Sequence, residues 1–302
     1  MASKVKLTFL GTSSSIPTAK RNHTGVLLIY EGEKILIDCG EGIQRQIRKA
    51  KLNPCKITKI LITHWHGDHV LGLPGLFQTL ALSEYHKELI IYGPYGTKKY
   101  IESMFNAFNF VNKFNFRIVE IDTNGKFFEN DDFYLEAKKL YHNITCLGYN
   151  FVKKGERKIY KSKLKKSKLP EGPLLQQLKE GKAIIYNNKR YLPEQLTYKE
   201  DDVKISFILD TRFNTEIIPF IKNSNLLVCD ATFEPGMEEL AEERNHMTAS
   251  QAAGLAKQAK VKKLVLTHIS ERYDRKENEV LKKVSKIFHS PFLVQDLSVV
   301  EV

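Results

Sequence analysis

The sequence is poor in cysteine, with only four among 302 residues. They are Cys39, Cys55, Cys146 and Cys229, and no two are close enough to form a Cys-x-x-Cys pair. This spacing excludes a zinc knuckle, a Cys-x-x-Cys redox motif and a dense disulfide framework. Such cysteine usage is typical of a reducing compartment, so we predict a cytoplasmic protein.

Long apolar runs are also absent. No run approaches the roughly 18 apolar residues that a membrane-spanning helix needs. The first nine residues lack the apolar segment of a secretory signal peptide. We therefore predict no membrane partner. The length and the hydrophobic content of 42% favour one large α/β domain or two small ones with a full core.

Acidic residues are scarce relative to basic ones, which gives a net charge of +12. Residues 151–170 hold nine Lys or Arg against one Glu, a local excess of +8. A segment this basic and this poor in apolar residues is expected to bury little and to form an arm or mobile loop. It is either an electrostatic handle for phosphates or an ordinary solvated loop.

The apolar pattern of the first half alternates between strands and helices, which favours α/β layering. The sequence also shows a partial internal similarity: residues 59–64 resemble 263–268, and 35–38 resemble 207–210. In each case an apolar strand ends in a metal-capable residue, so two similar halves could present their strand ends to one shared cleft. The alternative is a coincidence among Ile/Leu/Val strands. The predicted strands are 5–10, 25–30, 34–37, 57–62 and 89–92, and the predicted helices are 41–50 and 76–83.

The densest cluster of metal-binding side chains directly follows the apolar run at 57–62. It comprises His64, His66, Asp68 and His69. In an extended chain His64 and His66 project to the same side, because the side-chain period of a strand is two. Imidazole favours zinc and related transition metals, and a carboxylate favours a harder ion or a bridging role. The pattern predicts a metal hydrolase rather than a polar loop with structural histidines.

Two-metal hydrolysis needs more ligands, because the metals lie about 3.5–4 Å apart and share bridging groups. His142, Asp210 and His268 each follow a separate predicted strand, at 133–140, 205–209 and 264–266. Taken singly, each is more often a structural residue than a ligand. Together with the cluster at 64–69 they complete a set of the right size and chemistry.

A second cluster lies at residues 241–248. Glu243 and His246 are three positions apart, so on a helical turn they would share a face. A carboxylate beside an imidazole favours its charged form and fixes its tautomer, so the pair could protonate a leaving oxygen. The alternative is a helix N-cap at Thr248 with an incidental histidine.

With these residues in place, the chain resembles ribonuclease Z (tRNase Z), a family of tRNA 3′-processing endonucleases in the metallo-β-lactamase superfamily. The block at 64–69 alone would indicate only the superfamily. The Gly-Leu-Pro-Gly-Leu continuation at 72–76 and the Ala-x-Glu-x-x-His-x-Thr block at 241–248 are typical of ribonuclease Z itself. Further matching segments, in the family order, are 9–22, 37–44, 210–212, 231–233 and 266–273.

The resemblance implies an α/β fold of the metallo-β-lactamase type, a four-layer αββα sandwich. It would be a single domain over residues 1–302, with a protruding, flexible tRNA-binding arm inserted at 151–195. The resemblance also implies two Zn²⁺ per subunit, with Mn²⁺ or another divalent metal as alternatives. By position, His64, His66 and His142 would hold one zinc, Asp68, His69 and His268 the other, and Asp210 would bridge them.

The resemblance also implies roles for residues around the metals. Asp68 would help to deprotonate the attacking water, and Asp38 would support the ligands. His246, oriented by Glu243, would be the general acid for the leaving 3′ oxygen. Substrate contacts would come from Arg272 and Tyr273 beside the cleaved phosphate, together with Ser270, and from Lys163, Lys165 and Lys166 in the arm.

The implied activity is that of a metal-dependent endoribonuclease acting on precursor tRNA, commonly as a homodimer. It would cut after the discriminator nucleotide, leaving a 3′-hydroxyl on the tRNA and a 5′-phosphate on the trailer. One alternative is a related phosphodiesterase or hydrolase that acts on another RNA or a small ester, against which the basic arm argues. The other is a nucleic-acid-binding protein on an inactive scaffold, against which the complete ligand set argues.

Three departures from the family pattern are visible. Cys229 and Asp230 stand where the family often has His-Glu, Met247 follows His246 in place of a small residue, and the arm carries extra lysines. We expect none of them to touch a predicted ligand.

Overall fold

The structure is a computed structural model that describes residues 4–109, 114–273 and 276–302. It divides into two compact units. Unit 1 takes in the described residues of Met1–Phe128, Leu135–Phe151 and Lys204–Val302, and unit 2 takes in Glu129–Tyr134 and Val152–Val203. No helix in these described ranges is both long and apolar enough to cross a membrane.

The first sheet of unit 1 has the strand order β18-β1-β2-β3-β4-β5-β6. Neighbours are antiparallel from β18 to β3 and parallel from β3 to β6. The carboxyl ends of the parallel strands therefore meet at one edge of the sheet. The strands are β1 (Lys6–Gly11), β2 (Gly25–Tyr30), β3 (Glu33–Ile37), β4 (Lys59–Leu61), β5 (Glu88–Pro94), β6 (Asn115–Ile121) and β18 (Val299–Glu301).

The second sheet has the order β17-β16-β15-β14-β9-β8-β7, and its strands from β14 to β17 run parallel. Every residue of β9 is buried, as expected for a strand that is covered on both faces. The strands are β7 (Gly125–Glu129), β8 (Phe133–Leu140), β9 (Cys146–Lys153), β14 (Val203–Ile208), β15 (Leu226–Asp230), β16 (Leu264–Thr267) and β17 (Phe292–Leu293).

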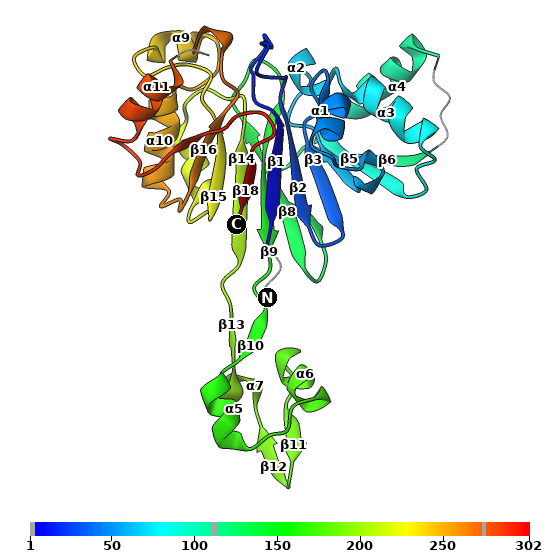
Figure 1. The fold of residues 1–302 in the computed structure, drawn as a ribbon, viewed down its shortest axis with the longest axis vertical. Coiled ribbons are helices and arrows are strands. Elements are labelled where there is room, and N and C mark those ends of the chain that lie inside the picture. The colour runs from blue at the N-terminus through cyan, green and yellow to red at the C-terminus, as the bar shows by residue number, and fades with distance from the viewer. Residues whose placement is uncertain (1–3, 110–113, 274–275) are drawn as a thin grey trace. The chain divides into compact units, whose positions relative to one another are not determined.

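Helices cover the outer face of each sheet, so the layers of unit 1 follow the order αββα (Figure 1). Apolar residues of α1, α3 and α4 share a core with the first sheet, and those of α8, α10 and α11 share one with the second. These arrangements confirm the predicted four-layer fold. The helices are α1 (Ile43–Lys49), α2 (Gly67–Val70), α3 (Leu73–Leu82), α4 (Thr97–Ala107), α8 (Ile218–Ile221), α9 (Glu238–Glu243), α10 (Ala249–Gln258) and α11 (Glu277–Val284), with 3₁₀ turns at Pro54–Lys56, Thr215–Ile217 and Glu271–Tyr273.

The predicted strands agree with the structure to within two residues, and β2 and β8 have the predicted bounds. The helix predicted at 76–83 begins earlier, at Leu73, because Pro74 lies in its first turn, where a missing N–H is tolerated. The helix predicted at 41–50 begins later, because Gly42 adopts φ 78° and serves as the N-cap of α1.

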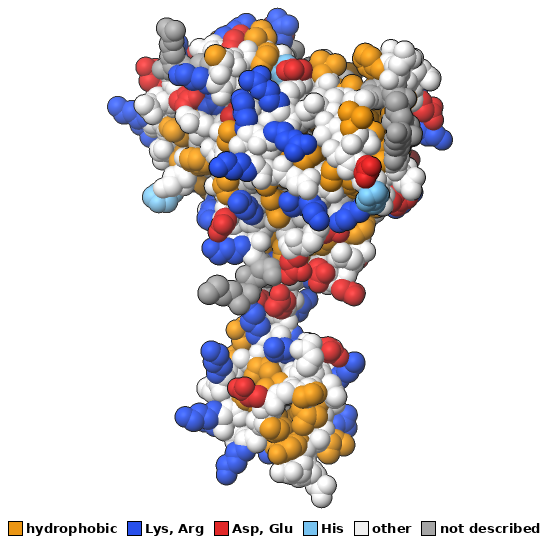
Figure 2. Space-filling model, turned by 45° about the vertical axis from the view of Figure 1, so that its right-hand side comes forward, with side chains coloured by type: hydrophobic (Ala, Val, Ile, Leu, Met, Phe, Trp, Pro, Cys, Tyr) orange, Lys and Arg blue, Asp and Glu red, His pale blue; other side chains and the backbone are white. Residues whose placement is uncertain are grey.

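Unit 2 has a hydrophobic core of its own. Six buried residues pack together: Leu169, Leu175, Leu178, Ile184, Tyr191 and Leu196. Only Leu169 of these six lies in the basic segment at 151–170, and no residue from 154 to 168 is buried, so this core forms mainly from the residues that follow the basic segment. Figure 2 shows Lys and Arg side chains over the visible surface of this unit. Its elements are β10 (Arg157–Ile159), α5 (Lys161–Ser167), α6 (Pro173–Lys179), β11 (Ile184–Tyr186), β12 (Lys189–Tyr191), α7 (Pro193–Leu196) and β13 (Thr197–Lys199), with β10 paired to β13 and β11 to β12.

Candidate metal centre and active site

The seven predicted ligands all lie in unit 1, and each follows the end of a strand. The segment after β4 carries His64 and His66 and then enters α2, which carries Asp68 and His69. The other three, His142, Asp210 and His268, lie just beyond β8, β14 and β16. Strand ends from both sheets thus meet in one cleft, as the internal sequence similarity predicted.

The first group of ligand atoms comes from His64, His66, His142 and Asp210. His66 Nδ1 lies 3.0 Å from His64 Nε2 and 3.1 Å from His142 Nε2. Asp210 Oδ2 lies 3.6 Å from His64 Nε2. Three imidazoles and one carboxylate therefore direct their ligand atoms at a common point.

The second group comes from Asp68, His69, Asp210 and His268, all of them buried. His69 Nε2 and His268 Nε2 are 3.2 Å apart, and Asp210 Oδ1 lies 3.3 Å from each. Asp68 Oδ2 lies 3.5 Å from His69 Nε2 and 3.3 Å from His268 Nε2. Because Asp210 belongs to both groups, one carboxylate connects two neighbouring ligand sets.

The hydrogen bonding of these atoms tests whether the residues fit metal ions. Asp210 Oδ1 is buried and has no hydrogen-bond partner among the described residues, although two imidazole nitrogens lie 3.3 Å away. A buried acceptor without a partner is costly, whereas a cation between these atoms would satisfy it. Histidine and carboxylate ligands of this kind suit zinc and other divalent transition metals, so the residues fit the implied metals.

Neighbouring polar groups fix the orientation of the ligands. Asp38 Oδ2 lies 2.7 Å from His69 Nδ1, while both of its oxygens accept hydrogen bonds from Thr63. Thr232 Oγ1 lies 2.7 Å from His268 Nδ1. Each imidazole thereby points its Nε2 into the cleft, the arrangement that metal-binding histidines generally use. Asp38 and His268 adopt φ 57° and 60°, which turns the chain sharply at the ends of β3 and β16.

Burial and mutual electrostatics set the charge of the ligands. Burial lowers the pKa of His64 well below its usual value, and the nearby His69 lowers it further. Burial opposes ionisation of Asp210, but His268 and His69 hold its pKa well below the usual range. Burial also opposes protonation of His268, yet Asp210 with Asp230 and Asp68 raises its pKa to about 10. The positive charge of protonated histidines thus balances the negative charge of the carboxylates here. Bound metal ions would displace these protons.

His246 lies beside the second group, and its partner is Asp230. Its Nδ1 is 3.0 Å from Asp230 Oδ2, and the Asp230 side chain is fully buried at the end of β15. Although burial opposes it, Asp230 and then Asp210 raise the pKa of His246. His246 retains 15% exposure, so a protonated imidazole is available at the wall of the cleft.

The prediction that Glu243 orients His246 is wrong. Helix α9 ends at Glu243, and Asn245 adopts φ 56°, so the three-residue spacing does not place the two side chains on one helical face. Glu243 is exposed and pairs with Arg244 at 3.5 Å. The alternative interpretation, a helix N-cap at Thr248, is confirmed. Thr248 is the N-cap of α10, and its side chain accepts a hydrogen bond from Gln251 N–H.

Asp230 is the functional residue that sequence reasoning missed. Besides His246, its carboxylate accepts hydrogen bonds from Thr232 and lies 3.7 Å from His268 Nδ1. The expectation that this departure from the family pattern touches no ligand is therefore wrong. Its position offered a signal, because it ends an apolar strand in the same way as the ligand Asp210.

A pocket of about 400 Å³ opens over the ligand groups. Arg272 lines it and is largely exposed. Tyr273 does not line it: its side chain is buried in the core, and its hydroxyl lies 2.9 Å from Met237 Sδ. The predicted contact between Tyr273 and the cleaved phosphate is therefore wrong. The wall includes residues from five segments: Ser14 to Ile16; His66; His142 and Asn143; Thr232, Phe233, Leu240, Arg244 and His246; and Ser270 to Arg272.

The predicted arm lysines belong to unit 2. Lys163, Lys165 and Lys166 lie on α5 and are exposed. Lys163 Nζ stands 4.3 Å from the ring centre of Tyr160, and no acidic residue occurs in α5. The exposed lysines of α5 therefore carry positive charge that no acidic residue of the same helix offsets.

Comparison with known proteins agrees with this geometry. A family model described as anti-Pycsar protein Apyc1 matches residues 5–106, which cover β1 to β5 and the helices beside them. Ribonuclease Z of Oceanobacillus iheyensis is 39% identical over 306 residues, covering 99% of this chain and 100% of that protein. Ribonuclease Z of Methanothermobacter thermautotrophicus is 36% identical, covering 99% and 97%.

Solved structures show the same fold. Human tRNase Z, short form, superposes with a TM-score of 0.72 at 27% identity, covering 98% of each chain. The metallo-β-lactamase fold protein YhfI from Bacillus subtilis has a TM-score of 0.71 at 17% identity, over 99% of this chain and 100% of that one. From its identity to full-length relatives and its fold, the chain belongs to the ribonuclease Z family and is a metal-dependent endoribonuclease of the metallo-β-lactamase fold.

Proposed function

We propose that this enzyme removes the 3′ trailer from precursor tRNA by hydrolysis after the discriminator nucleotide. The products are a 3′-hydroxyl on the tRNA and a 5′-phosphate on the trailer. The observation that carries this proposal is the pair of ligand groups joined by Asp210, with the protonatable His246 beside them in one pocket. The substrate class follows from relatives named ribonuclease Z and tRNase Z.

The pocket residues divide into metal ligands and proton carriers. His64, His66 and His142 would hold one divalent metal, Asp68, His69 and His268 a second, and Asp210 would lie between the two. The donor set favours zinc, and manganese is an alternative. When bound, the metals supply Lewis-acid stabilisation of phosphoryl oxygens and lower the pKa of a water toward about 7.

The protein's own side chains then handle two protons. The Asp68 carboxylate lies at the second ligand group, with Oδ2 3.3 Å from His268 Nε2, and would accept a proton from the attacking water there. His246 carries a proton that it can give to the leaving 3′ oxygen. Asp230 holds the other imidazole nitrogen and stabilises the charged form before transfer. Arg272 would contact the phosphate at the pocket wall.

Unit 2 supplies the proposed grip on the tRNA body. We assign residues 151–195, nearly all of which belong to unit 2, as an arm inserted into a single domain that spans 1–302. Exposed Lys163, Lys165 and Lys166 would meet backbone phosphates, a mode that reads RNA shape rather than sequence. We also propose a homodimer, from the family resemblance, and a cytoplasmic location, from the cysteine usage.

The testing experiment is cleavage of a precursor tRNA with a 3′ trailer, mapped to the nucleotide. Wild type, His66→Ala and the control His86→Ala, an exposed histidine outside the pocket, are compared at known metal content. We expect a cut after the discriminator that His66→Ala loses and His86→Ala keeps. A metal-loaded wild type that leaves this RNA intact but hydrolyses a small phosphodiester would overturn the tRNA assignment.

A further inference from the structure

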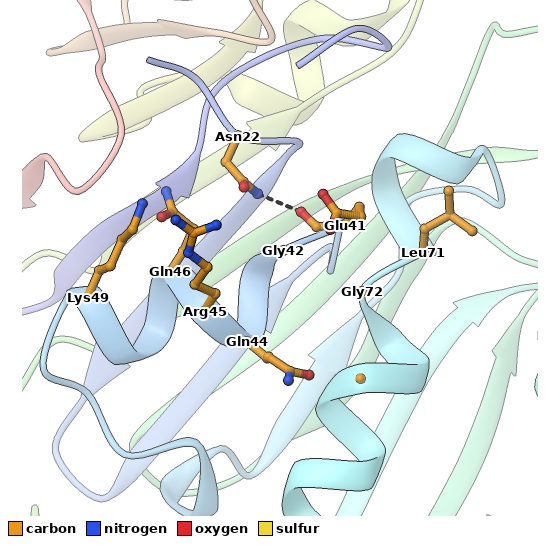
Figure 3. Close-up of a pocket in the computed structure, with 10 residues that line it drawn as sticks. Asn22, Glu41, Gly42, Gln44, Arg45, Gln46, Lys49, Leu71 and Gly72 are labelled. Atoms are coloured by element: carbon orange, nitrogen blue, oxygen red, sulfur yellow. Dashed lines mark hydrogen bonds between the residues drawn. The ribbon is translucent and has the colours of Figure 1, made fainter. Parts of the chain in front are cut away.

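A second cavity in unit 1 lies beside helix α1, and none of the predicted ligands lines it. It has a volume of about 320 Å³ and is enclosed by α1, the loop that carries Asn22 and residues 71–75 (Figure 3). Asn22 Nδ2 donates a hydrogen bond of 2.6 Å to the carbonyl oxygen of Glu41, which ties the loop to the start of the helix. A neighbouring cavity of about 520 Å³ shares Asn22, Glu41, Arg45, Gln46 and Lys49 with it.

The charged side chains of this α1 cavity are mainly basic. Arg45 and Lys49 are four residues apart on α1, so they project from one face of the helix into both cavities. Within the described part of the chain, neither side chain makes a hydrogen bond or an ion pair. The acidic residue among the lining side chains is Glu41. In the neighbouring cavity, exposed Lys20 adds positive charge and Asp296 adds a second carboxylate to that of Glu41.

Two buried basic side chains of unit 1 are neutralised within the fold. Buried Arg21 pairs with Glu277, and Lys59 pairs with Glu33 at 2.8 Å. The cations of the α1 cavity have no such partner, which favours an external anion. Their arrangement around a hollow further favours a ligand that enters it over diffuse surface charge.

Two segments connect the α1 cavity to the active pocket. Ser14, Ser15 and Ile16 line the active pocket, and the same loop continues to Asn22 at the α1 cavity. Helix α2 carries the predicted ligand His69, and Leu71 follows it into the cavity wall, where its side chain is 60% exposed. An RNA strand that leaves the active pocket across this loop would reach the α1 cavity next.

The size of the cavity indicates which part of the RNA it takes. Pockets from roughly 300 Å³ upward suit a small ligand, and this one suits a single nucleotide. Bases of duplex RNA are stacked inside the helix, whereas a single strand can place one base in a pocket. The single-stranded region next to the proposed cut is the trailer.

We propose that the α1 cavity binds a nucleotide of the 3′ trailer. Its flanking phosphates meet Arg45 and Lys49, while the base lies against Leu71 and meets the exposed amide of Gln44. This inference rests on the proposed function and adds a second RNA contact, on the trailer side of the cut. Trailer length thereby becomes a determinant of cleavage rate.

The test compares precursor tRNAs whose trailers grow one nucleotide at a time to about ten nucleotides, within the site sizes of single-strand binding. The variant is Arg45→Gln with Lys49→Gln. The matched control, Lys282→Gln with Lys283→Gln, removes the same charge from exposed positions on α11. The readout is the ratio of kcat/KM for each trailer to kcat/KM for the one-nucleotide trailer, across a salt series.

We expect the long-trailer ratio of the α1 variant to fall about tenfold at physiological salt, with a salt slope lower by about 1.4, because two phosphate contacts are lost. The α11 control should keep the wild-type ratio. Equal losses at every trailer length would overturn the proposal and place the contact on the acceptor stem. No loss at any length would also overturn it. A wild type that cleaves none of these RNAs would instead refute the proposed function.

Discussion

Replacing Asp230 with Asn tests the proton-donating arrangement most directly. Oδ1 of Asp230 accepts hydrogen bonds from Thr232 N and Oγ1, and Oδ2 accepts from Met247 N and faces His246 Nδ1 at 3.0 Å. An asparagine amide has one acceptor oxygen and one NH₂ group. In Asp230→Asn the NH₂ group must therefore face either the Thr232 donors or the side of Met247 N and His246. Either orientation leaves a buried N–H unpaired, at a cost of about 1–3 kcal/mol of stability.

The catalytic effect should exceed the stability effect. Without the carboxylate, His246 loses the group that fixes its tautomer and stabilises its charged form. General acid catalysis is worth about 10²–10⁴-fold, so kcat for precursor tRNA should fall within that range. The assay pairs this RNA with bis(p-nitrophenyl) phosphate, whose leaving group needs no proton. On that substrate we expect Asp230→Asn to lose roughly tenfold or less, a small part of the general-acid contribution.

The control is Glu243→Gln, which changes the carboxylate that the sequence pattern favoured. Because Glu243 is exposed, we expect its kcat on precursor tRNA to stay within about twofold of wild type. Metal content is measured for every variant, since Asp230 also lies near His268. Equal losses by Asp230→Asn on both substrates at full metal content would refute the reasoning, as would a large loss by Glu243→Gln.

Three further predictions concern the metals, the arm and the core. Removing metal with a chelator should lower the melting temperature and abolish cleavage, because Asp210 loses its compensating cation. Adding zinc should restore both, and an unchanged melting curve would contradict this prediction. Changing Lys163, Lys165 and Lys166 together to Gln should raise KM for tRNA by roughly 30- to 100-fold, with no comparable loss on a small phosphodiester; equal losses on both substrates would contradict the arm assignment. Tyr149→Phe should destabilise the fold by about 1–3 kcal/mol in denaturant titration, because the Tyr149 hydroxyl donates a hydrogen bond of 2.6 Å to Ile62 O between the sheets. The control Tyr95→Phe changes an exposed tyrosine and should alter the stability little.

The ligand positions were predictable because each lies just past a strand whose apolar pattern is visible in the sequence. His64, Asp210 and His268 end such runs, and parallel strands bring their carboxyl ends to one edge. The same logic applies to Asp230 at the end of β15, where nothing in a single sequence distinguishes a supporting carboxylate from a structural one. Only the placement of β15 between β14 and β16 puts it behind the ligands.

The two wrong assignments have a local cause. Glu243 and His246 have helical spacing, but the helix stops between them, and a terminus can shift by a residue or two without any clear signal in the sequence. Tyr273 follows a ligand strand, as Arg272 does, yet the short 3₁₀ turn Glu271–Tyr273 sends neighbouring side chains in different directions. In both cases spacing along the chain was a poor guide to direction in space.

The arm shows how a basic segment can still fold. Its buried residues, from Leu169 to Leu196, are spread over several short elements, and the spacing of Leu175 and Leu178 on α6 is the short amphipathic run that the sequence shows. Its strands are only three residues long and become stable only by packing on the helices. The lysines of α5 stay outside this core, which separates charge from packing. A rigid, charged surface can hold phosphates in a defined geometry, whereas a disordered lysine run would lose conformational entropy at each contact.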